Sequence, residues 1–407
     1  MSPVKTLRVE DYPKLKGYFK PNICGVPPEI TEEKEWRKLW YYGNRELEAK
    51  TRLVRTGVLK CITLVQQVKF DLENRDIYVK LANNITGRLL NVPEDERMGE
   101  ILRRPVLASI TIQGKKPVVY ISKVYGEETD VNELLDIVEE LELTPLHLLV
   151  WGYGYHFSRD TGRVMIPRLL SLFKIDNRPV YVVQLTPPNT GKTHFALRNR
   201  TAFNWGYTAE VPSLAYLVYN ARDGFYGIVF TRDGVAFDGM EKWSDQSFRL
   251  SKDYELLLTG MEQGIWGRGV STPVNEVYKV LNMLFLGNVT FEEDKPDRKY
   301  VQEVLSFMWN TEVFLDRISL CDVMYERIDL QRYISDYILP DGVLYSLVKT
   351  LEEKAQKVTG VKSSLQGRLR RHSIAVQKVM SVLGLEPDSE KVDEMVEYGV
   401  RYSWENQ

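Results

Sequence analysis

The stretch Thr186-Pro187-Pro188-Asn189-Thr190-Gly191-Lys192-Thr193 directly follows an apolar run over residues 180–185. The residues after it are typical of a helix, so the sequence predicts a buried strand, a tight loop and a helix amino terminus. That combination binds phosphate, because backbone N–H groups and the positive end of the helix dipole face the anion. We expect Lys192 to reach the β- and γ-phosphates of a nucleotide and the Thr193 hydroxyl to ligate Mg²⁺. The alternative is a chance Gly-Lys-Thr in an ordinary strand-to-helix turn.

The bulk composition excludes several classes of protein. A length of 407 residues with 43% hydrophobic content predicts two or three packed domains. The 54 Lys and Arg against 56 Asp and Glu give a net charge of −2, so nucleic acid would need a local basic surface. Three scattered cysteines and four histidines argue against a disulfide scaffold or a zinc site. Without a run of 18 apolar residues or a signal peptide, we expect a cytoplasmic protein with no membrane contact.

Three regions follow one another along the chain. Residues 1–140 contain alternating strand patterns and predict a mainly β domain for nucleic-acid binding or oligomerisation, although each single aromatic residue is more readily explained as core. Residues 145–325 alternate helices with short apolar strands, which is typical of an α/β core with a parallel sheet. Residues 326–407 predict a helical lid subdomain. The expected fold class is therefore α/β, with a β-rich domain in front of the core and a helical lid behind it.

Two polar residues at strand ends follow the phosphate loop. An apolar run ends in Asp238, where a carboxylate can hold the water shell of Mg²⁺. Many ATPases with a phosphate loop place a glutamate directly after that acid to activate the attacking water. Here Gly239 stands in that position, so the nearest acid, Glu241, is either the general base or a solvated surface residue. A second run ends in Asn288, whose amide can orient water near the γ-phosphate or can belong to an ordinary turn.

Residues 261–269 hold three glycines around Trp266 and Arg268. Such a composition is typical of an exposed hairpin tip, where functional residues often lie. Trp266 could stack on a nucleic-acid base and Arg268 could contact phosphate. The alternative is a turn whose tryptophan packs inward.

Two later arginines are candidates for contact with a nucleotide. Arg317 stands in the apolar segment 313–318. An arginine presented to the γ-phosphate of a neighbouring subunit raises the rate by about 10³–10⁵ and implies a ring. Arg368 belongs to a run of three arginines, one of which could close over the nucleotide from the lid. The alternatives are a surface pair between Arg317 and Asp316, and a solvated helix face around Arg368.

Residues 186–193 resemble the phosphate loop of AAA+ ATPases, which commonly reads Gly-Pro-Pro-Gly-Thr-Gly-Lys-Thr. Segments 261–269, 284–288 and 314–318 resemble the MEsGsFsRG, vfvGN and FLDRI segments of the Lon-like AAA+ proteins of BREX phage-defence systems (BrxL), which are related to MCM helicases. The likeness covers about residues 145–385 and keeps the order of the segments. It implies an AAA+ P-loop core with ATP and Mg²⁺ as cofactors.

The resemblance also implies a role for each matching residue. Lys192 and Thr193 would be the Walker A residues, Asp238 the Walker B acid, Asn288 sensor 1, Arg317 the arginine finger and Arg368 sensor 2, with the hairpin of Trp266 and Arg268 near a central pore. The nucleotide would contact Thr186, Pro187, Pro188, Asn189, Thr190, Gly191, Lys192, Thr193, Asp238 and Arg368, with Thr193 and Asp238 at the metal and Glu241, Asn288 and Arg317 in catalysis. Thr186 and Asn189 replace two loop glycines, and Gly239 replaces the catalytic glutamate, so we expect slow turnover.

These observations favour a ring-forming ATPase, hexameric or larger. We expect it to bind duplex or single-stranded DNA and to use ATP to translocate along it or open it. A helicase-like motor in the replication of an archaeal mobile element or virus is the setting that the resemblance implies. Two alternatives remain at this point. One is a protein unfoldase that threads polypeptide through the same pore, and the other is a nucleotide-gated scaffold with weak hydrolysis.

Overall fold

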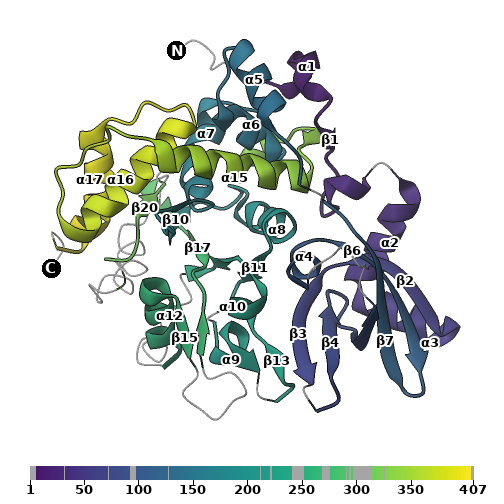
Figure 1. Ribbon diagram of the computed structural model, residues 1–407. Coiled ribbons are helices and arrows are strands. Elements are labelled where there is room, and N and C mark those ends of the chain that lie inside the picture. Colours follow the sequence, from purple (N-terminus) through teal and green to yellow (C-terminus); the bar gives the residue numbers. More distant parts are fainter. Residues whose placement is uncertain are drawn as a thin grey trace.

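Figure 1 shows the β-sheet of the early part of the chain beside an α/β body, with the C-terminal helices packed on the α/β body. The computed structural model describes most of the chain, and every structural statement below concerns these residues. The described ranges are 6–31, 33–71, 73–91, 98–126, 128–210, 212–220, 222–240, 252–267, 276–289, 291–292, 295–296, 314, 316–324 and 326–404.

The α/β body is built on a parallel sheet whose strand order is β11-β14-β17-β10-β20. Its three central strands, β14, β17 and β10, are almost entirely buried, as expected for a parallel sheet covered by helices on both faces. The expectation of an α/β core with a parallel sheet is therefore confirmed. The five strands are β10 (Val182–Thr186), β11 (Trp205–Thr208), β14 (Gly234–Asp238), β17 (Asn282–Asn288) and β20 (Leu320–Val323).

Alternate residues of the central strands pack into two separate cores. Val182 of β10 faces the larger core, and Val183 and Leu185 face the smaller one. The larger core contains side chains of α6 (Pro145–Gly152), α7 (Arg159–Leu170), α8 (Lys192–Ala202), α15 (Asp341–Lys357), α16 (Gly367–Val382) and α17 (Ser389–Trp404). The smaller core contains side chains of α9 (Leu214–Leu217), α10 (Ile228–Thr231) and α12 (Lys252–Gln263).

Strand register brings the polar strand ends to one edge of the parallel sheet. Thr186, the last residue of β10, pairs with Asn288, and Asp238 at the end of β14 pairs with Leu286. β17 thus lies between the strand that leads into the phosphate loop and the strand that ends in Asp238. All three carboxyl ends face the amino terminus of α8, which is where parallel α/β sheets bind ligands.

The early part of the chain forms a six-stranded mixed sheet of order β2-β6-β7-β5-β4-β3. One pair, β5 with β7, is parallel and the others are antiparallel. The expected mainly β region is therefore confirmed. Its elements are α2 (Lys34–Asn44), α3 (Glu46–Thr56), β2 (Val58–Thr63), β3 (Val65–Asp71), β4 (Asp76–Leu81), β5 (Thr86–Asn91), α4 (Met98–Arg103), β6 (Val106–Gln113) and β7 (Lys116–Val124).

The buried side chain of Arg232 joins the two bodies. Its guanidinium donates to the backbone oxygens of Val65 (2.9 Å), Gln66 (3.1 Å) and Leu102 (3.0 Å) and to the side-chain oxygen of Asn204 (2.6 Å). The three backbone oxygens belong to the β-sheet body, whereas Asn204 precedes β11. Buried carbonyls need partners, so this single cation satisfies both sides of the contact.

Residues 7–22 pack on the α/β body, whereas Val26 and Ile30 pack with Ile62 of β2 and with Leu64 beside the six-stranded sheet. Val9, Leu15 and Phe19 lie in the larger core, and β1 (Lys20–Pro21) pairs with β21 (Tyr337–Ile338). The domain boundaries expected at residues 140, 145 and 325 remain a prediction. The other short elements are η1 (Val9–Asp11), α1 (Pro13–Lys16), η2 (Pro28–Ile30), α5 (Asn132–Glu140), β8 (Lys174–Ile175), β9 (Arg178–Pro179), β12 (Tyr219–Asn220), β13 (Phe225–Tyr226), β15 (Ile265–Gly267), β16 (Glu276–Tyr278), β18 (Phe291–Glu292), β19 (Lys295–Pro296) and η4 (Leu330–Tyr333).

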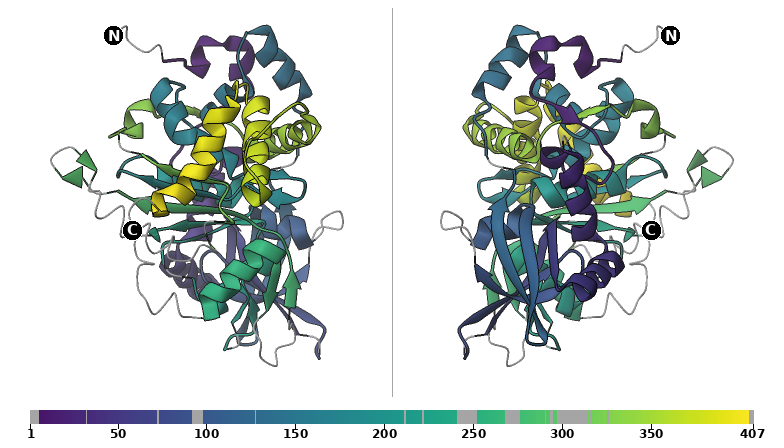
Figure 2. Two further views of the ribbon diagram at one scale, coloured as in Figure 1. Left: turned by 90° about the vertical axis from the view of Figure 1, so that its left-hand side faces the viewer. Right: turned by 90° about the vertical axis from the view of Figure 1, so that its right-hand side faces the viewer.

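Three long helices end the chain, as the sequence predicts. Figure 2 shows α16 and α17 in front of the α/β body in one side view and behind it in the other, so they lie on the side remote from the six-stranded sheet. α15 instead crosses toward that sheet, where the Arg103 guanidinium lies 4.4 Å from the centre of the Tyr345 ring. None of the helices in the described ranges is both long and apolar enough to cross a membrane.

The four histidines predict how stability depends on pH. Burial lowers the pKa of His147, His156, His194 and His372 below the ordinary value of 6.5. The unfolded chain therefore binds protons more readily than the folded one once the pH falls below 6.5. We expect the urea midpoint of unfolding to be constant from about pH 8 to pH 7 and to fall toward pH 5.5, above the range in which carboxylates titrate. A midpoint that rises on acidification would contradict this.

Candidate nucleotide-binding site

Backbone conformation shapes the phosphate loop, residues 186–193. Asn189 and Gly191 both adopt left-handed conformations, with φ of 65° and 69°, and α8 begins at Lys192. Asparagine tolerates this region better than most residues, so it can replace a glycine in the loop. Gly191 has a second constraint, because a Cβ there would lie 2.3 Å from the Tyr155 hydroxyl. The sequence motif therefore forms the strand, loop and helix that it predicts.

The loop lysine is buried and satisfied within the loop. Its ammonium donates to the backbone oxygens of Thr186 (3.2 Å) and Pro187 (2.9 Å) and to the Thr186 hydroxyl (3.1 Å). Only 8% of Lys192 is exposed. A cation held at the floor of the loop by neutral oxygens keeps its charge available for an anion at the helix amino terminus.

Thr193 and Asp238 meet at the mouth of the loop. The Thr193 hydroxyl donates to Oδ2 of Asp238 over 3.2 Å, and the Tyr207 hydroxyl donates to the same oxygen over 3.1 Å. Burial and the charge of Asp238 raise the pKa of Tyr207, which keeps its hydroxyl protonated. A threonine hydroxyl and a carboxylate are oxygen ligands of the kind Mg²⁺ prefers.

A cavity of about 510 Å³ opens in front of these groups. This volume lies within the range of small-molecule sites. The lining includes predicted residues of the phosphate loop together with Asp238 and Asn288. Thr186 and Pro187 do not line the cavity, but their oxygens accept hydrogen bonds from Lys192. The full set of lining residues is Asn22, Cys24, Gly154, Tyr155, Pro188, Asn189, Thr190, Gly191, Lys192, Thr193, His194, Asp238, Asn288, Leu330, Gln331 and Ile334.

Sequence reasoning missed the less polar end of this cavity. Tyr155, Leu330 and Ile334 line it, together with Asn22 of the N-terminal segment. The Leu330 N–H donates to the Asn189 oxygen (3.1 Å), and the Asn22 amide donates to the Ser335 oxygen (2.8 Å). These residues come from three segments far apart in the chain, and no local pattern signals that they meet. Their chemistry suits the flat, apolar face of a base.

A buried arginine supports the phosphate loop from behind. Arg168 of α7 is fully buried, and its guanidinium donates to the Thr190 oxygen (2.6 Å), the Thr190 hydroxyl (3.2 Å) and the Gln184 side-chain oxygen (2.6 Å). Gln184 in turn donates to Asp322 of β20 over 3.0 Å. Burial lowers the pKa of Arg168 to about 10, so the group stays charged at neutral pH. No pattern in the sequence indicates this role.

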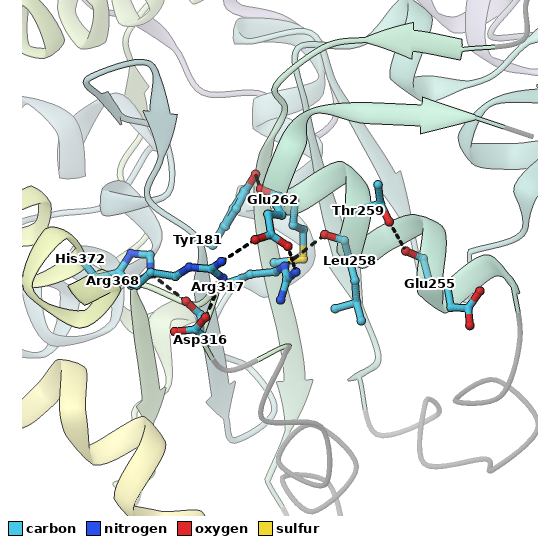
Figure 3. Close-up of polar contacts among 10 residues, drawn as sticks. Tyr181, Glu255, Leu258, Thr259, Glu262, Asp316, Arg317, Arg368 and His372 are labelled. Atoms are coloured by element: carbon cyan, nitrogen blue, oxygen red, sulfur yellow. Dashed lines mark hydrogen bonds and ion pairs between the residues drawn. The ribbon is translucent and has the colours of Figure 1, made fainter. Parts of the chain in front are cut away.

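The two predicted arginines lie together, but they are not among the residues that line the cavity. Arg317 and Arg368 both form ion pairs with Glu262, the penultimate residue of α12. Figure 3 shows the Glu262 carboxylate between the two guanidinium groups. Arg368 also donates to Asp316 over 2.6 Å. The structure thus joins the two candidates that the sequence treated separately, and it places Arg368 beside Arg317 rather than over the phosphate loop.

Trp266 points inward rather than toward solvent. It is fully buried, its indole N–H donates to the Lys279 oxygen over 2.8 Å, and its ring packs over Gly260. This supports the alternative of an inward-packed turn, so a base cannot stack on Trp266 in this arrangement. The exposed aromatic of the β15–β16 hairpin is Tyr278, at 72%. Two further predicted residues, Glu241 and Arg268, lie outside the described residues.

Comparison with known proteins gives one family and three viral relatives. Residues 128–407 match the family described as Lon-like protease BrxL-like, ATPase domain. An uncharacterized protein of Acidianus filamentous virus 2 is 27% identical over 404 residues, 89% of this chain and 93% of the relative. Uncharacterized proteins of Sulfolobus islandicus rod-shaped virus 1 (28% identical; 67% of this chain, 66% of the relative) and Acidianus filamentous virus 1 (27%; 64% and 67%) also match.

A solved structure is similar over much of the chain. The full-length MCM homologue from Methanopyrus kandleri matches with a TM-score of 0.46 and 13% sequence identity. The match covers 86% of this chain and 77% of that chain.

The Arg168 contacts predict a role in shaping the nucleotide site. Lysine at this position keeps the charge, but its three donors sit on one nitrogen and cannot reproduce the contacts that Arg168 makes from three separate nitrogens. We expect Arg168→Lys to weaken binding of a fluorescent ATP analogue by about tenfold, since a loosened loop no longer presents its N–H groups together. Arg159→Lys, an exposed arginine on the same helix, is the matched control. Equal affinity of the two variants would show that Arg168 does not position the loop.

Proposed function

The chain belongs to the family of ATPase domains of Lon-like, BrxL-like proteins, and on this premise we propose that it is a ring-forming motor that couples ATP hydrolysis to movement on DNA. One observation carries the nucleotide part of the proposal. Lys192, Thr193, Asp238 and Asn288 meet at one edge of a parallel sheet and line a single cavity.

The donor set fits a nucleotide with a divalent cation. Lys192 would exchange its loop oxygens for phosphate oxygens, and Thr193 with Asp238 would hold Mg²⁺. The amide of Asn288, level with Thr186 in the sheet, would orient water beside the terminal phosphate. Bound Mg²⁺ supplies charge neutralisation on the phosphates.

The general base in this proposal is Glu241. Asp238 is the acid among the lining residues that the structure describes. It accepts hydrogen bonds from the Thr193 and Tyr207 hydroxyls, an arrangement that fits metal binding better than proton abstraction. Gly239 follows with a left-handed φ of 93°, and its N–H still donates to the Leu286 oxygen of β17 over 2.9 Å. Turnover would be slow in this proposal, because Gly239 supplies no carboxylate in the position next to Asp238.

Arg317 acts between subunits in this proposal, because it lies at the wrong edge of the sheet to reach its own nucleotide. It precedes β20, whose first residue, Leu320, pairs with Val182 at the start of β10. The phosphate loop follows the other end of β10, four residues later, which is roughly 13 Å along the strand. An arginine that serves a phosphate from this position must serve the site of a neighbouring copy, and repeated head-to-tail contacts form a ring when the rotation between copies closes.

The DNA part of the proposal rests on the outer face of the six-stranded sheet. Lys69, Tyr78 and Arg88 stand in one cross-strand row there, and Lys80 lies two residues beyond Tyr78 on β4. Arg88 also pairs with Asp76 over 3.3 Å, and the cations beside the Tyr78 ring fit a phosphate backbone with an exposed base. Because the net charge of the whole chain is −2, attraction of DNA phosphates requires a local basic surface of this kind. The viral relatives are compatible with a replication setting.

We expect slow, Mg²⁺-dependent ATP hydrolysis that Lys192→Ala abolishes, because the variant loses the cation at the phosphates. Steady-state phosphate release would be measured alone, with single-stranded DNA and with an unfolded polypeptide. Stimulation by DNA that weakens as salt rises supports the motor on DNA. Stimulation by polypeptide alone would replace it with an unfoldase. ATP binding without turnover in wild type and in Glu241→Gln would identify a scaffold.

Mixing two inactive variants tests whether the site is shared. Lys192→Ala lacks the nucleotide contact and Arg317→Ala lacks the arginine, so each alone should have little activity. In a mixed ring, an Arg317→Ala subunit can receive the arginine of a Lys192→Ala neighbour. We expect random mixing to restore about a quarter of the wild-type rate. Activity no higher than the sum of the separate variants would contradict an arginine acting between subunits.

A further inference from the structure

Glu262 binds both arginines of the predicted intersubunit site. One of its carboxylate oxygens pairs with Arg317 and the other with Arg368. Arg317 also donates through Nε to the Leu258 oxygen over 3.1 Å, and Arg368 donates to Asp316 over 2.6 Å. Figure 3 shows Glu262 bridging between α12 and the two arginines. Two carboxylates therefore neutralise two guanidinium groups within one copy of the chain.

The charges of this cluster are mutually stabilised. Burial alone would raise the pKa of Glu262, but the charges of Arg317 and Arg368 lower that pKa below its ordinary value. The Arg317 side chain is 9% exposed, whereas those of Glu262, Arg368 and Asp316 are 33%, 36% and 44% exposed, so solvent reaches the Glu262 carboxylate and the Arg368 end of the cluster. Carboxylate and phosphate are alternative bidentate partners for a guanidinium group. A phosphate approaching from outside would compete with Glu262 for the same donors.

Glu262 also belongs to the same rigid unit as the β15–β16 hairpin. Gly260, two residues earlier on α12, packs under the Trp266 ring so closely that a Cβ would lie 2.3 Å from it. The Gly264 N–H donates to the Gly260 oxygen (3.0 Å), and the Lys279 N–H donates to the Gly264 oxygen (2.7 Å). A force on the hairpin is therefore transmitted to the carboxylate through packed, hydrogen-bonded groups.

We propose that Glu262 is a positioning residue, a counterion that Arg317 and Arg368 must exchange for the nucleotide phosphate of a neighbouring copy. The inference rests on the proposed function. In the separate subunit, Glu262 holds the arginine pair neutral and docked on α12. In the assembly, displacement of α12 with its hairpin releases the pair to the phosphate, so whatever the hairpin contacts controls hydrolysis at the adjacent site.

Glu262→Gln tests the exchange, because the amide keeps the shape but removes the charge. We expect the KM for ATP of the assembled variant to fall at least about fivefold, since phosphate no longer competes with a carboxylate. We also expect stimulation by single-stranded DNA to diminish, because release of the arginines no longer depends on the hairpin. Glu255→Gln, an exposed acid on the same helix, is the matched control and should leave both quantities at wild-type values.

A second measurement does not depend on catalysis. Modification by phenylglyoxal, followed at Arg317 and Arg368 by peptide mass spectrometry, should be several-fold faster in nucleotide-free Glu262→Gln than in wild type or Glu255→Gln. Unchanged reactivity, or a raised KM together with a lower melting temperature, would overturn the counterion role and leave a purely structural one. Loss of the ring ATPase proposal has a different signature, namely wild type without turnover or Arg317→Ala with full activity.

Discussion

The parallel register of β10, β17 and β14 is the constraint on which the nucleotide site depends. Hydrogen bonding between these strands sets Thr186 level with Asn288 and leaves Asp238 level with Leu286. Three polar strand ends therefore meet at one edge, and a slip by one residue would turn them to the other face. The same register places Arg317 before the opposite end of β20. One constraint thus builds the cavity and separates the arginine from it.

A phosphate loop with fewer glycines needs order from elsewhere, and the chain supplies it with side chains. The hydroxyl of Thr186, where a glycine is usual, lies 2.8 Å from the Thr190 hydroxyl. Arg168 fixes Thr190 from behind through two donors, and its third contact is a hydrogen bond to the Gln184 side-chain oxygen. Burying one guanidinium costs several kcal/mol unless its donors are satisfied, and here neutral oxygens satisfy them. The replaced glycine is therefore compatible with phosphate binding.

The sequence predicts the parts of the site that are local in the chain. The strand, loop and helix around Gly191, and the strand ends at Asp238 and Asn288, follow from patterns of a few residues. Arg168 and the Tyr155 end of the cavity could not be predicted, because their roles depend on contacts between segments that only the fold brings together. For Trp266 the local pattern leaves two possibilities open, because its glycine-rich surroundings suit a turn whose tryptophan points outward as well as one whose tryptophan points inward. Packing against Gly260 decides that it points inward.

An inward tryptophan changes what the hairpin can do. A tip that binds by stacking needs an exposed ring, whereas the buried Trp266 ring packs β15–β16 against α12. The end of that helix carries Glu262, whose carboxylate neutralises Arg317 and Arg368. An arginine pair left without counterions would repel itself and bind stray anions in a free subunit. In the proposed ring, the carboxylate that prevents this is also the group that the hairpin moves, so stability of the single subunit and control of the shared site depend on the same side chain.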